Sequence, residues 1–390
     1  MNEAILDLQR EDDRFSSDAA LSYTLTSEHY TDPDLHALER ERVFARNWSL
    51  VCHQSEIANP GDFRRHRVAE EELFVIRGRD GVVRGFYNVC RHRASQLIDE
   101  AAGNKRAFIT CPYHSWAYDH EGKLRAAHNC ENVAGFDKAD FSLAGVAVEV
   151  FLGFVFVNLD TQARPLAERF GDLSAWMLRE CPGIDDYRLL YQADNEVPCN
   201  WKLLVENLIE SYHLELSGPA HKTFVEVVAC DEDAGGEAPY AAVTHDGWSS
   251  HAGPAGAPEN AAYAWSSPRT LGATNAFATF HVFPDWAFLL WPGANALTVF
   301  INSPAGPETT AQRFAYYGPE GEPDEATRGM MHYFSHVLGP EDNELCSRVQ
   351  KGLRSRSYRQ GRLMVDAARS AVSEHPVHHF QAQIRDAMGL

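Results

Sequence analysis

The feature that most constrains this chain is a pair of short motifs, each with one cysteine and one histidine. Cys90-Arg91-His92 is followed, after 18 residues, by Cys111-Pro112-Tyr113-His114. Two thiolates and two imidazoles can hold two irons bridged by two sulfides, with the cysteines on one iron and the histidines on the other. The same residue types can hold one zinc ion, but zinc fingers normally group a cysteine pair before a histidine pair. The order here favours the iron cluster, and zinc remains the alternative.

The segments around these motifs have the alternation and turn residues of short strands. GDFRRHRVAEEELFVIRGRDGVVRGFYNV predicts successive strands that turn at Arg79-Asp80-Gly81, and SWAYDHEGKLRAA predicts a hairpin that turns at Glu121-Gly122. Each metal-binding motif therefore lies in a loop pinned by strands.

With its context, the first constellation resembles a Rieske [2Fe–2S] domain. NVCRHRASQL and CPYHSWAYDHEGKL are similar to the Rieske domains of ring-hydroxylating-type oxygenase α subunits. The resemblance implies that Cys90, His92, Cys111 and His114 bind the cluster. It departs from the family in its long gap between the motifs, and in Ser115, which stands where glycine is common.

Composition limits the other functions. The formal net charge of -20 argues against nucleic acid or an anionic membrane as the main partner, because both favour a positive surface. No apolar run reaches 18 residues, and we expect neither a signal peptide nor a membrane span. Eight cysteines in such a chain indicate reduced thiols or metal ligands. These features fit an acidic cytoplasmic enzyme.

A second constellation lies in NWKLLVENLIESYH, which predicts a helix. Glu210 and His213 are three residues apart and share one side of that helix, with Glu206 close to the same stripe. A mononuclear Fe(II) that reacts with oxygen takes two histidines and one carboxylate on one face. The alternative is an amphipathic helix with a solvated acidic face.

This stretch resembles the catalytic signature of Rieske oxygenases. The resemblance implies that His213 is the first iron ligand and that Asn207 lies near the iron. It implies that Glu210 bridges an iron ligand to a Rieske histidine of the neighbouring subunit. The second histidine usually follows the first by about five residues, but here His221 comes eight residues later, after the turn-forming pair Gly218-Pro219. We expect His221 to be the second ligand, and an ordinary surface histidine is the alternative.

The third ligand should be a carboxylate far along the chain. GPEDNELCSRVQKGL predicts a helix that opens with acidic residues, and it resembles the iron-ligand helix of the family. We expect Asp342 to be the ligand, with Glu341 as the second choice. Acidic residues are also common here simply as helix caps.

The predicted fold class is α+β. The expected divisions are an N-terminal helical segment (1–45) that packs on the catalytic domain, a β-rich Rieske domain (46–160) and a catalytic mononuclear iron domain (161–390). The resemblance implies that the catalytic domain is helix-grip-like, with an antiparallel sheet around a long helix, and that the working cluster and iron belong to different subunits of a homotrimer.

The chain has no GxGxxG segment after a strand, so NAD(P)H should be used by a separate reductase, possibly through a ferredoxin. Arg91 and Arg93 could meet an acidic donor protein. Glu210 followed by Tyr-His is similar to the branch that oxidises betaines and carnitine with O2, which implies monooxygenation and N-demethylation. A methylammonium would suit an aromatic cage, and the candidates are Trp248, Tyr263, Trp265, Phe280, Phe283 and Trp286.

Three other functions stay open at this stage. The first is hydroxylation of an aromatic ring or aromatic acid, for which the same aromatic residues would form an apolar slot. The second is an electron-transfer Rieske protein without oxygenase activity, which would leave His213 and Asp342 without a function. The third is a zinc-stabilised binding module.

Overall fold

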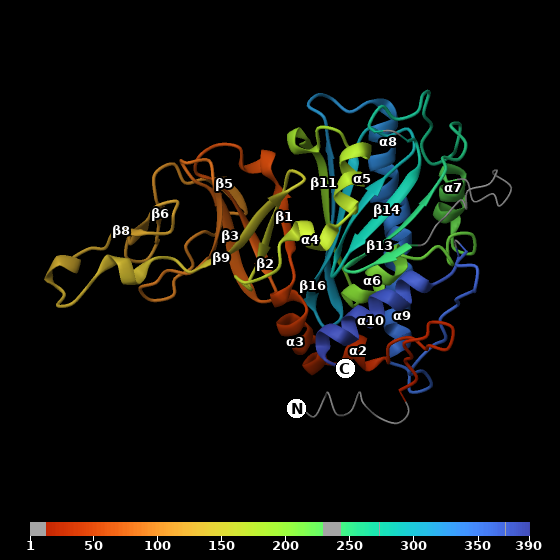
Figure 1. The fold of residues 1–390 in the computed structure, drawn as a ribbon, viewed down its shortest axis with the longest axis horizontal. Helices are drawn as coiled ribbons and strands as arrows, with labels where there is room; N and C mark the ends of the chain where they lie inside the picture. Colours follow the sequence, from red (N-terminus) through yellow and green to blue (C-terminus); the bar gives the residue numbers. More distant parts are fainter. Residues whose placement is uncertain (1–12, 229–242, 273, 371) are drawn as a thin grey trace. The chain divides into compact units, whose positions relative to one another are not determined.

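The structure, a computed structural model, describes residues 13–228, 243–272, 274–370 and 372–390. The chain divides into two compact units, one rich in strands and one that mixes strands with helices (Figure 1). The first unit comprises Phe44–Glu168 and Asp185–Arg188, and the second comprises Met1–Val43, Arg169–Ile184 and Leu189–Leu390. The strand-rich unit thus extends beyond the predicted range of 46–160 at both ends. Residues 1–12 of the predicted N-terminal segment lie outside the described residues.

The strand-rich unit contains a seven-stranded antiparallel sheet and a three-stranded one. The large sheet has the order β1-β10-β9-β4-β3-β2-β5, and the small one has the order β6-β7-β8. The strands are β1 (Ser49–His53), β2 (Asp62–Val68), β3 (Glu71–Arg77), β4 (Val83–Tyr87), β5 (Ala102–Asn104), β6 (Ile109–Thr110), β7 (Ala117–Tyr118), β8 (Leu124–Ala126), β9 (Gly145–Phe151) and β10 (Phe154–Asn158).

Both predicted hairpin turns are present in this unit. Gly81 lies between β3 and β4 at φ 80°, and Gly122 lies between β7 and β8 at φ 79°. Glycine adopts this left-handed backbone without steric cost. The turn at Gly122 closes the hairpin that follows the second cysteine motif.

The second unit is built on a seven-stranded sheet in the order β11-β17-β16-β15-β14-β13-β12, in which the pairs from β12 to β17 are antiparallel. Antiparallel sheets combined with helices confirm the predicted α+β class. The strands are β11 (Arg188–Val197), β12 (Val243–His245), β13 (Trp248–Gly253), β14 (Phe277–Val282), β15 (Trp286–Leu290), β16 (Leu297–Gly306) and β17 (Thr309–Gly318).

Helices lie before, between and after these strands along the chain. They are α2 (Glu28–Thr31), α3 (Pro33–Arg42), α4 (Leu166–Phe170), α5 (Leu173–Glu180), α6 (Trp201–Leu208), α7 (Pro219–Val227), α8 (Glu325–Tyr333), the π-helix η6 (Phe334–Leu338), α9 (Gly339–Leu353) and α10 (His375–Met388). In the described part of the chain, no helix is both long and apolar enough to cross a membrane.

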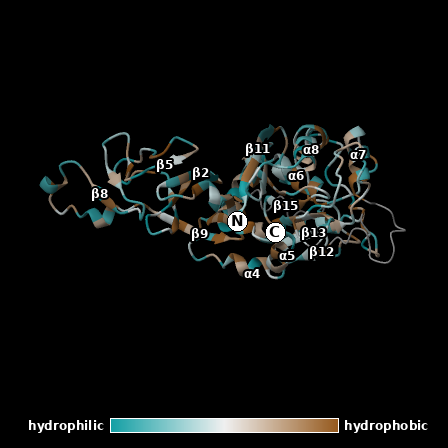
Figure 2. Ribbon diagram, turned by 90° about the horizontal axis from the view of Figure 1, so that it is seen from above, coloured by the Kyte–Doolittle hydropathy of each residue, from teal (hydrophilic) through white to brown (hydrophobic). Residues whose placement is uncertain are grey.

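The central strands β14 and β15 and the first six residues of β16 are buried on both faces of this sheet. Because side chains alternate along each strand, the two faces carry different residues. One face, which we call the inner face, carries Phe277, Leu289, Phe300 and Phe314 and joins a core cluster with α7, α8 and η6. The other, the outer face, carries Trp248, Phe280 and Trp286, as the strand register requires. On this outer face Phe280 packs on Trp176 of α5, with ring centroids 4.2 Å apart. Figure 2 shows the hydrophobic residues concentrated on strands and helices.

Helix α6 is fixed to the N-terminal segment by a buried ion pair. Lys202 Nζ lies 2.5 Å from Glu39 Oε1 of α3, and neither side chain is exposed. Trp201 Nε1 donates to the other oxygen of Glu39 at 3.1 Å. Both charges have close partners, which a buried pair needs to offset its desolvation.

One turn later on α6, Glu206 is buried against two further segments. Tyr30 Oη of α2 and Gln381 Nε2 of α10 donate to Glu206 Oε1 at 2.7 and 2.9 Å. Burial raises the pKa of Glu206 to about 7, although these hydrogen bonds favour the carboxylate. The helix that leads to the second motif is thus tied to both ends of the described chain.

We predict that Glu206→Gln makes the protein more stable at high pH. The folded protein holds the Glu206 proton more tightly than the unfolded chain, whose carboxyl keeps its ordinary pKa of 4.5. The contribution of Glu206 to the free energy of unfolding of the wild-type protein is therefore lost as the pH rises from 4.5 through 7. The variant should gain roughly 3 kcal/mol over wild type above pH 7 and almost nothing below pH 4.5. Urea unfolding across this range measures the difference.

Glu39→Gln is the matched control for this prediction. It leaves the buried Lys202 without a carboxylate and should destabilise the protein across the same range. A constant difference between Glu206→Gln and wild type at every pH would contradict the prediction.

Candidate active site

The two cysteine motifs of the strand-rich unit form loops with the same hydrogen-bond pattern. In each loop the cysteine N–H donates to the carbonyl five residues later at 2.8 Å. The N–H four residues after the cysteine donates back to the cysteine carbonyl, at 3.1 Å in the first loop and 3.0 Å in the second. That fourth residue has a left-handed backbone in both loops, with φ of 56° at Ala94 and 60° at Ser115. Such a position favours glycine, which explains why glycine is common where this chain has Ser115.

The four candidate cluster ligands come together at these loops. Cys90 and Cys111 are buried, whereas His92 is exposed and its ring centroid lies 4.6 Å from that of His114. Tyr118 Oη lies 3.3 Å from Cys90 Sγ. Two buried sulfurs with two outward imidazoles fit a cluster whose histidine-bound iron lies nearer the surface. Hydrogen bonds to a cysteine sulfur that binds the cluster help to set the reduction potential of such a cluster.

An aromatic wall lies beside the two histidines, and it was not predicted. The His92 ring stacks on Trp116 at 4.8 Å, and Trp116 in turn contacts Phe136 and Phe141. These residues and His114 line a hollow of about 750 Å³. Trp116 belongs to the loop of the second cysteine motif, and Phe136 and Phe141 come from the segment between β8 and β9.

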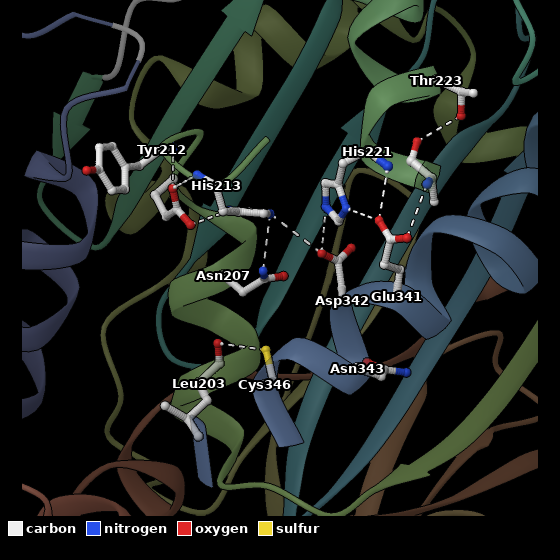
Figure 3. A network of polar contacts seen from close by, with 12 residues as sticks. Leu203, Asn207, Tyr212, His213, His221, Thr223, Glu341, Asp342, Asn343 and Cys346 are labelled. Atoms are coloured by element: carbon white, nitrogen blue, oxygen red, sulfur yellow. Dashed lines mark hydrogen bonds and ion pairs between the residues drawn. The ribbon is translucent and has the colours of Figure 1, made fainter. Parts of the chain in front are cut away.

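In the second unit, the structure brings the three predicted iron ligands together (Figure 3). His213, His221 and Asp342 each offer one possible ligand atom, and these three atoms lie within 4.8 Å of one another. His221 Nε2 lies 2.9 Å from Asp342 Oδ1, and His213 Nε2 lies 3.6 Å from the same oxygen. The two imidazole rings and one carboxylate thus converge on one point.

His213 is positioned by a turn and not, as predicted, by a continuing helix. Helix α6 ends at Leu208. Glu210 then accepts hydrogen bonds from the backbone N–H groups of Tyr212 and His213 and from His213 Nδ1. The Glu210 carboxylate accepts hydrogen bonds from backbone N–H groups that would otherwise bond within the helix. This competition accounts for the end of α6 at Leu208. The contact between Glu210 and His213 is nonetheless present.

His221 is positioned by a new helix, because α7 begins at Pro219. Its side chain is almost completely buried, which rules out the alternative of an ordinary surface histidine. Glu341 accepts hydrogen bonds from the backbone N–H groups of Ala220 and His221, each at 3.1 Å, and from His221 Nδ1 at 2.6 Å. A carboxylate from α9 therefore caps α7, where the helix dipole favours a negative charge.

Gly218 makes this arrangement possible. A Cβ atom at this position would lie 2.4 Å from Glu341 Oε2. Its φ is −76°, so glycine is needed here for close approach and not for an unusual backbone.

Each histidine thus has the same environment. A glutamate accepts from its Nδ1 and from the backbone N–H groups of the histidine and the preceding residue, which leaves Nε2 to face Asp342. This orientation is typical of metal-binding histidines. It also corrects the second choice for the third ligand, since Glu341 lies behind His221 and its oxygens do not face the convergence point.

The charge of the site suits a cation. Burial disfavours the charged imidazole of His213, but Asp342 and Glu210 raise its pKa to about 10. Asp342 Oδ1 is buried and faces the Nε2 atoms of both histidines. Two Nε2 atoms and one buried carboxylate oxygen form the donor set that ferrous iron takes in oxygen-activating sites.

Asn207, predicted to lie near the iron, is at the same place. Its Nδ2 lies 3.2 Å from His213 Nε2. A cavity of about 20 Å³, room for about one water molecule, is lined by Asn207 and Asp342 together with Phe300 and Phe314 of the inner face. The inner face of the sheet therefore borders Asp342, one of the three ligands.

Four of the six predicted cage residues lie outside the core cluster that contains Tyr263 and Trp265. Trp248, Phe280 and Trp286 lie on the outer face, and Phe283 packs on Phe380 of α10, with ring centroids 6.1 Å apart. That cluster also holds Phe224, Phe277 and Trp291, which sequence reasoning missed. Phe224 follows His221 by three residues on α7 and could have been found from helical spacing.

Comparison with family models agrees with both halves of the chain. A model described as the Rieske [2Fe-2S] domain matches residues 47–137. A model described as the ring hydroxylating alpha subunit (catalytic domain) matches residues 184–390. The two models together cover the cysteine motifs and all three converging ligands.

Two relatives match nearly the full length of the chain. The carnitine monooxygenase oxygenase subunit of Escherichia coli (strain K12) is 36% identical over 369 residues, which are 94% of this chain and 94% of that protein. The protein of the same name from Acinetobacter pittii (strain PHEA-2) is 35% identical over 373 residues, which are 94% of this chain and 95% of that protein.

Solved structures show the same similarity. A quaternary ammonium Rieske monooxygenase, studied for carnitine oxidation by gut microbiota, matches with a TM-score of 0.87 at 33% identity over 98% of this chain and 100% of that chain. A structure of such an enzyme with L-carnitine gives a TM-score of 0.84 at 32% identity over 97% of this chain and 99% of that chain. Naphthalene 1,2-dioxygenase from Rhodococcus sp., at 20% identity and a TM-score of 0.76 over 93% of this chain and 94% of that chain, shows the fold alone.

We predict that Glu341→Gln weakens metal binding at the three-ligand site. The amide loses the charge that holds His221 Nδ1–H, and such a loss typically reduces metal affinity about 10- to 100-fold. Titration of ferrous iron into protein that keeps its Rieske cluster but lacks the mononuclear iron measures the change, while the visible absorbance of the cluster should stay unchanged.

Glu344→Gln is the matched control, because Glu344 is an exposed residue of the same helix that pairs with Arg348. It should bind iron like wild type. Equal iron affinity in Glu341→Gln and wild type would show that the carboxylate does not orient the ligand.

Proposed function

Since the chain belongs to the ring-hydroxylating α subunit family of Rieske oxygenases, we propose that it is the oxygenase component of a multicomponent system that oxygenates a quaternary ammonium compound. The observation that carries this proposal is the 36% identity with a carnitine monooxygenase oxygenase subunit over 94% of both chains. The substrate class is betaine- or carnitine-like.

Two cofactors follow from the family and fit the residues present. Cys90, His92, Cys111 and His114 would hold the Rieske [2Fe–2S] cluster, and His213, His221 and Asp342 would hold a mononuclear Fe(II). When bound, the iron supplies a site where O2 is activated, and the cluster supplies electrons to it. NAD(P)H is consumed by a separate reductase, as is typical for the family.

The reaction balances as a monooxygenation. One oxygen atom of O2 enters a C–H bond of the substrate, and the other leaves as water after two electrons and two protons have been taken up. Hydroxylation of a carbon bound to the quaternary nitrogen leads to cleavage of that C–N bond. Attack on a methyl group gives formaldehyde, and attack on the chain carbon gives trimethylamine.

The chain's own residues have separate tasks in this scheme. Glu210 and Glu341 hold the two histidines with Nε2 free for the metal, and Asp342 supplies the anionic ligand. Asn207 offers an amide at 3.2 Å from His213 Nε2, where it can hydrogen-bond to a molecule beside the iron. The aromatic cluster excludes water from the space next to these ligands.

Glu210 would also connect subunits. We propose a homotrimer in which Glu210 links His213 of one subunit to a Rieske histidine of its neighbour. Support comes from the position of Glu210 on His213 Nδ1 and from its partly exposed carboxylate, which is 12% accessible. A reductase or ferredoxin would meet the exposed cluster loop, where Arg93 lies over the Tyr113 ring at 5.6 Å. The role of Arg91 and Arg93 and the cytoplasmic location stay predictions.

We predict O2-dependent cleavage of methylammonium acids by the purified protein with a surrogate reductase. L-Carnitine and γ-butyrobetaine should yield formaldehyde or trimethylamine, and benzoate should yield no hydroxylated product. Mass spectrometry of both amine and aldehyde products identifies the carbon attacked. His213→Ala should keep the visible spectrum of the cluster and lose turnover. Hydroxylation of benzoate without cleavage of either ammonium compound would favour an aromatic-acid hydroxylase instead.

We further predict that activity returns when two inactive variants share a trimer. Cys111→Ser removes the cluster, and Asp342→Ala removes the iron. Co-expressed subunits should regain turnover, because the cluster of one subunit serves the iron of the next. Adding Glu210→Ala to the Cys111→Ser subunit should abolish the recovery, while Glu215→Gln, at an exposed neighbouring position, should not. Mixed trimers without activity would refute electron transfer between subunits.

A further inference from the structure

The second half of α9 and the segment that follows it are basic in an acidic chain. The whole chain has 55 acidic and 35 basic side chains, but residues 345–365 carry six of the basic ones and no acidic one. We call this segment the basic strip, and its cations are Arg348, Lys351, Arg354, Arg356, Arg359 and Arg362. Charge concentrated in this way against the opposite background favours binding of an acidic partner.

The basic strip presents its charge to solvent. Five of the six cations are exposed, and Arg359 is half-buried. Three of the six pair with a carboxylate outside the strip. The Lys351 and Arg356 side chains form no ion pair with a described residue, and Arg362 donates to the backbone carbonyls of Ala20 and Ser22. Three positive charges are therefore left without a carboxylate of their own.

Apolar side chains lie among these cations. Val349, Tyr358 and Met364 are 50%, 39% and 51% exposed. Interfaces between proteins combine an apolar centre with a polar rim. The combination fits a protein as the partner better than a polyanion such as nucleic acid, which is bound mainly through its phosphates.

The strip is held in place by backbone hydrogen bonds to the N-terminal segment. Ser27 N donates to the Arg359 carbonyl at 2.8 Å, and Thr24 N donates to the Gly361 carbonyl at 3.1 Å. Gly361 N donates in turn to Thr24 Oγ1 at 2.9 Å. The surface is thus formed before a partner arrives, which reduces the entropic cost of binding.

Both ends of the strip lie near the metal site. Helix α9 carries Asp342 in its first turn, and Arg348 follows six residues later, roughly 9 Å along the helix axis. At the other end, Met364 N donates to Glu374 Oε2 at 2.5 Å. Burial and the charge of Glu210 raise the pKa of Glu374, so these two carboxylates are close to one another. The strip therefore borders the partly exposed Glu210.

We propose that the basic strip is the surface on which an acidic electron-donor protein docks. The inference rests on the proposed function, in which the Rieske cluster of the neighbouring subunit meets Glu210. A donor on the strip of one subunit then lies beside that cluster and contacts both subunits. One electron passes from the reduced donor to the oxidised cluster, and no bond is made or broken. The strip is needed because the net charge of the whole chain repels an acidic protein.

The test measures how fast a donor reduces the cluster. Purified holoenzyme is mixed in the absence of oxygen with a reduced plant-type [2Fe–2S] ferredoxin, chosen as an acidic carrier, and the visible absorbance of the Rieske cluster is followed. The second-order rate constant of the wild-type protein should fall as salt is added, because salt screens exposed charges. Lys351→Glu and Arg356→Glu should each lower it at least about threefold at low salt, and the loss should vanish at about 0.5 M salt.

Arg328→Glu is the matched control, because Arg328 is an exposed cation of α8 outside the strip. It makes the same change of charge and should keep the wild-type rate constant. Lys351→Gln and Arg356→Gln remove the charge without reversing it and should give smaller losses. Every variant should sediment as the same oligomer as the wild-type protein. After chemical reduction, each should form as much product from γ-butyrobetaine and O2 in a single turnover as the wild-type protein does.

Two results would overturn the docking surface. One is a rate constant in Lys351→Glu and Arg356→Glu equal to that of Arg328→Glu. The other is dissociation of the oligomer in these variants, which would make the strip a contact between subunits. The proposed function fails on a different result, namely that chemically reduced wild-type protein forms no product from γ-butyrobetaine or L-carnitine. Because reduction of the cluster needs no substrate, the two failures are measured separately.

Discussion

The contact on which the rest of the site depends is the hydrogen bond from each histidine Nδ1 to a glutamate. Glu210 holds His213, and Glu341 holds His221, and each carboxylate also binds two backbone N–H groups of the segment it orients. The side chain and backbone of each histidine are therefore fixed by one group. With Nδ1 occupied, Nε2 is the atom left for a metal, and Asp342 can complete the set without adjusting either ring.

Buried charged residues on α6 support the two histidines and their glutamates. Helix α6 contributes Lys202 and Glu206 to contacts with α2, α3 and α10, and it contributes Asn207 to the metal site. Segments from both ends of the chain thus fix the helix whose end leads to Glu210. Because burial disfavours the ionised form of Glu206, its carboxylate lowers the free energy of unfolding at neutral pH.

The sequence predicted the ligands better than it predicted what surrounds them. Cys90, His92, Cys111 and His114 could be found because each pair is local and its spacing is specific. Asp342 was preferred to Glu341 from the family resemblance, but the residues alone gave no reason for the choice, because neighbouring acids on a helix differ only in direction, and the direction matters only once α7 is in place. The end of α6 at Leu208 depended on the Glu210 carboxylate, which propensity does not include. Alternation predicted two faces for each strand, but it could not say which face meets α7 and the core cluster beside the metal ligands, so Trp286 was placed wrongly.

The close approach at Gly218 changes how the spacing of the two histidines should be understood. His221 is held by a helix that starts afresh and by a carboxylate more than a hundred residues away in the sequence. The segment between the histidines can therefore vary in length while the metal-facing atoms stay in place. What must be kept is a residue without a side chain where Glu341 passes. In related chains, a small residue ahead of a new helix should identify the second ligand more reliably than a fixed count from the first.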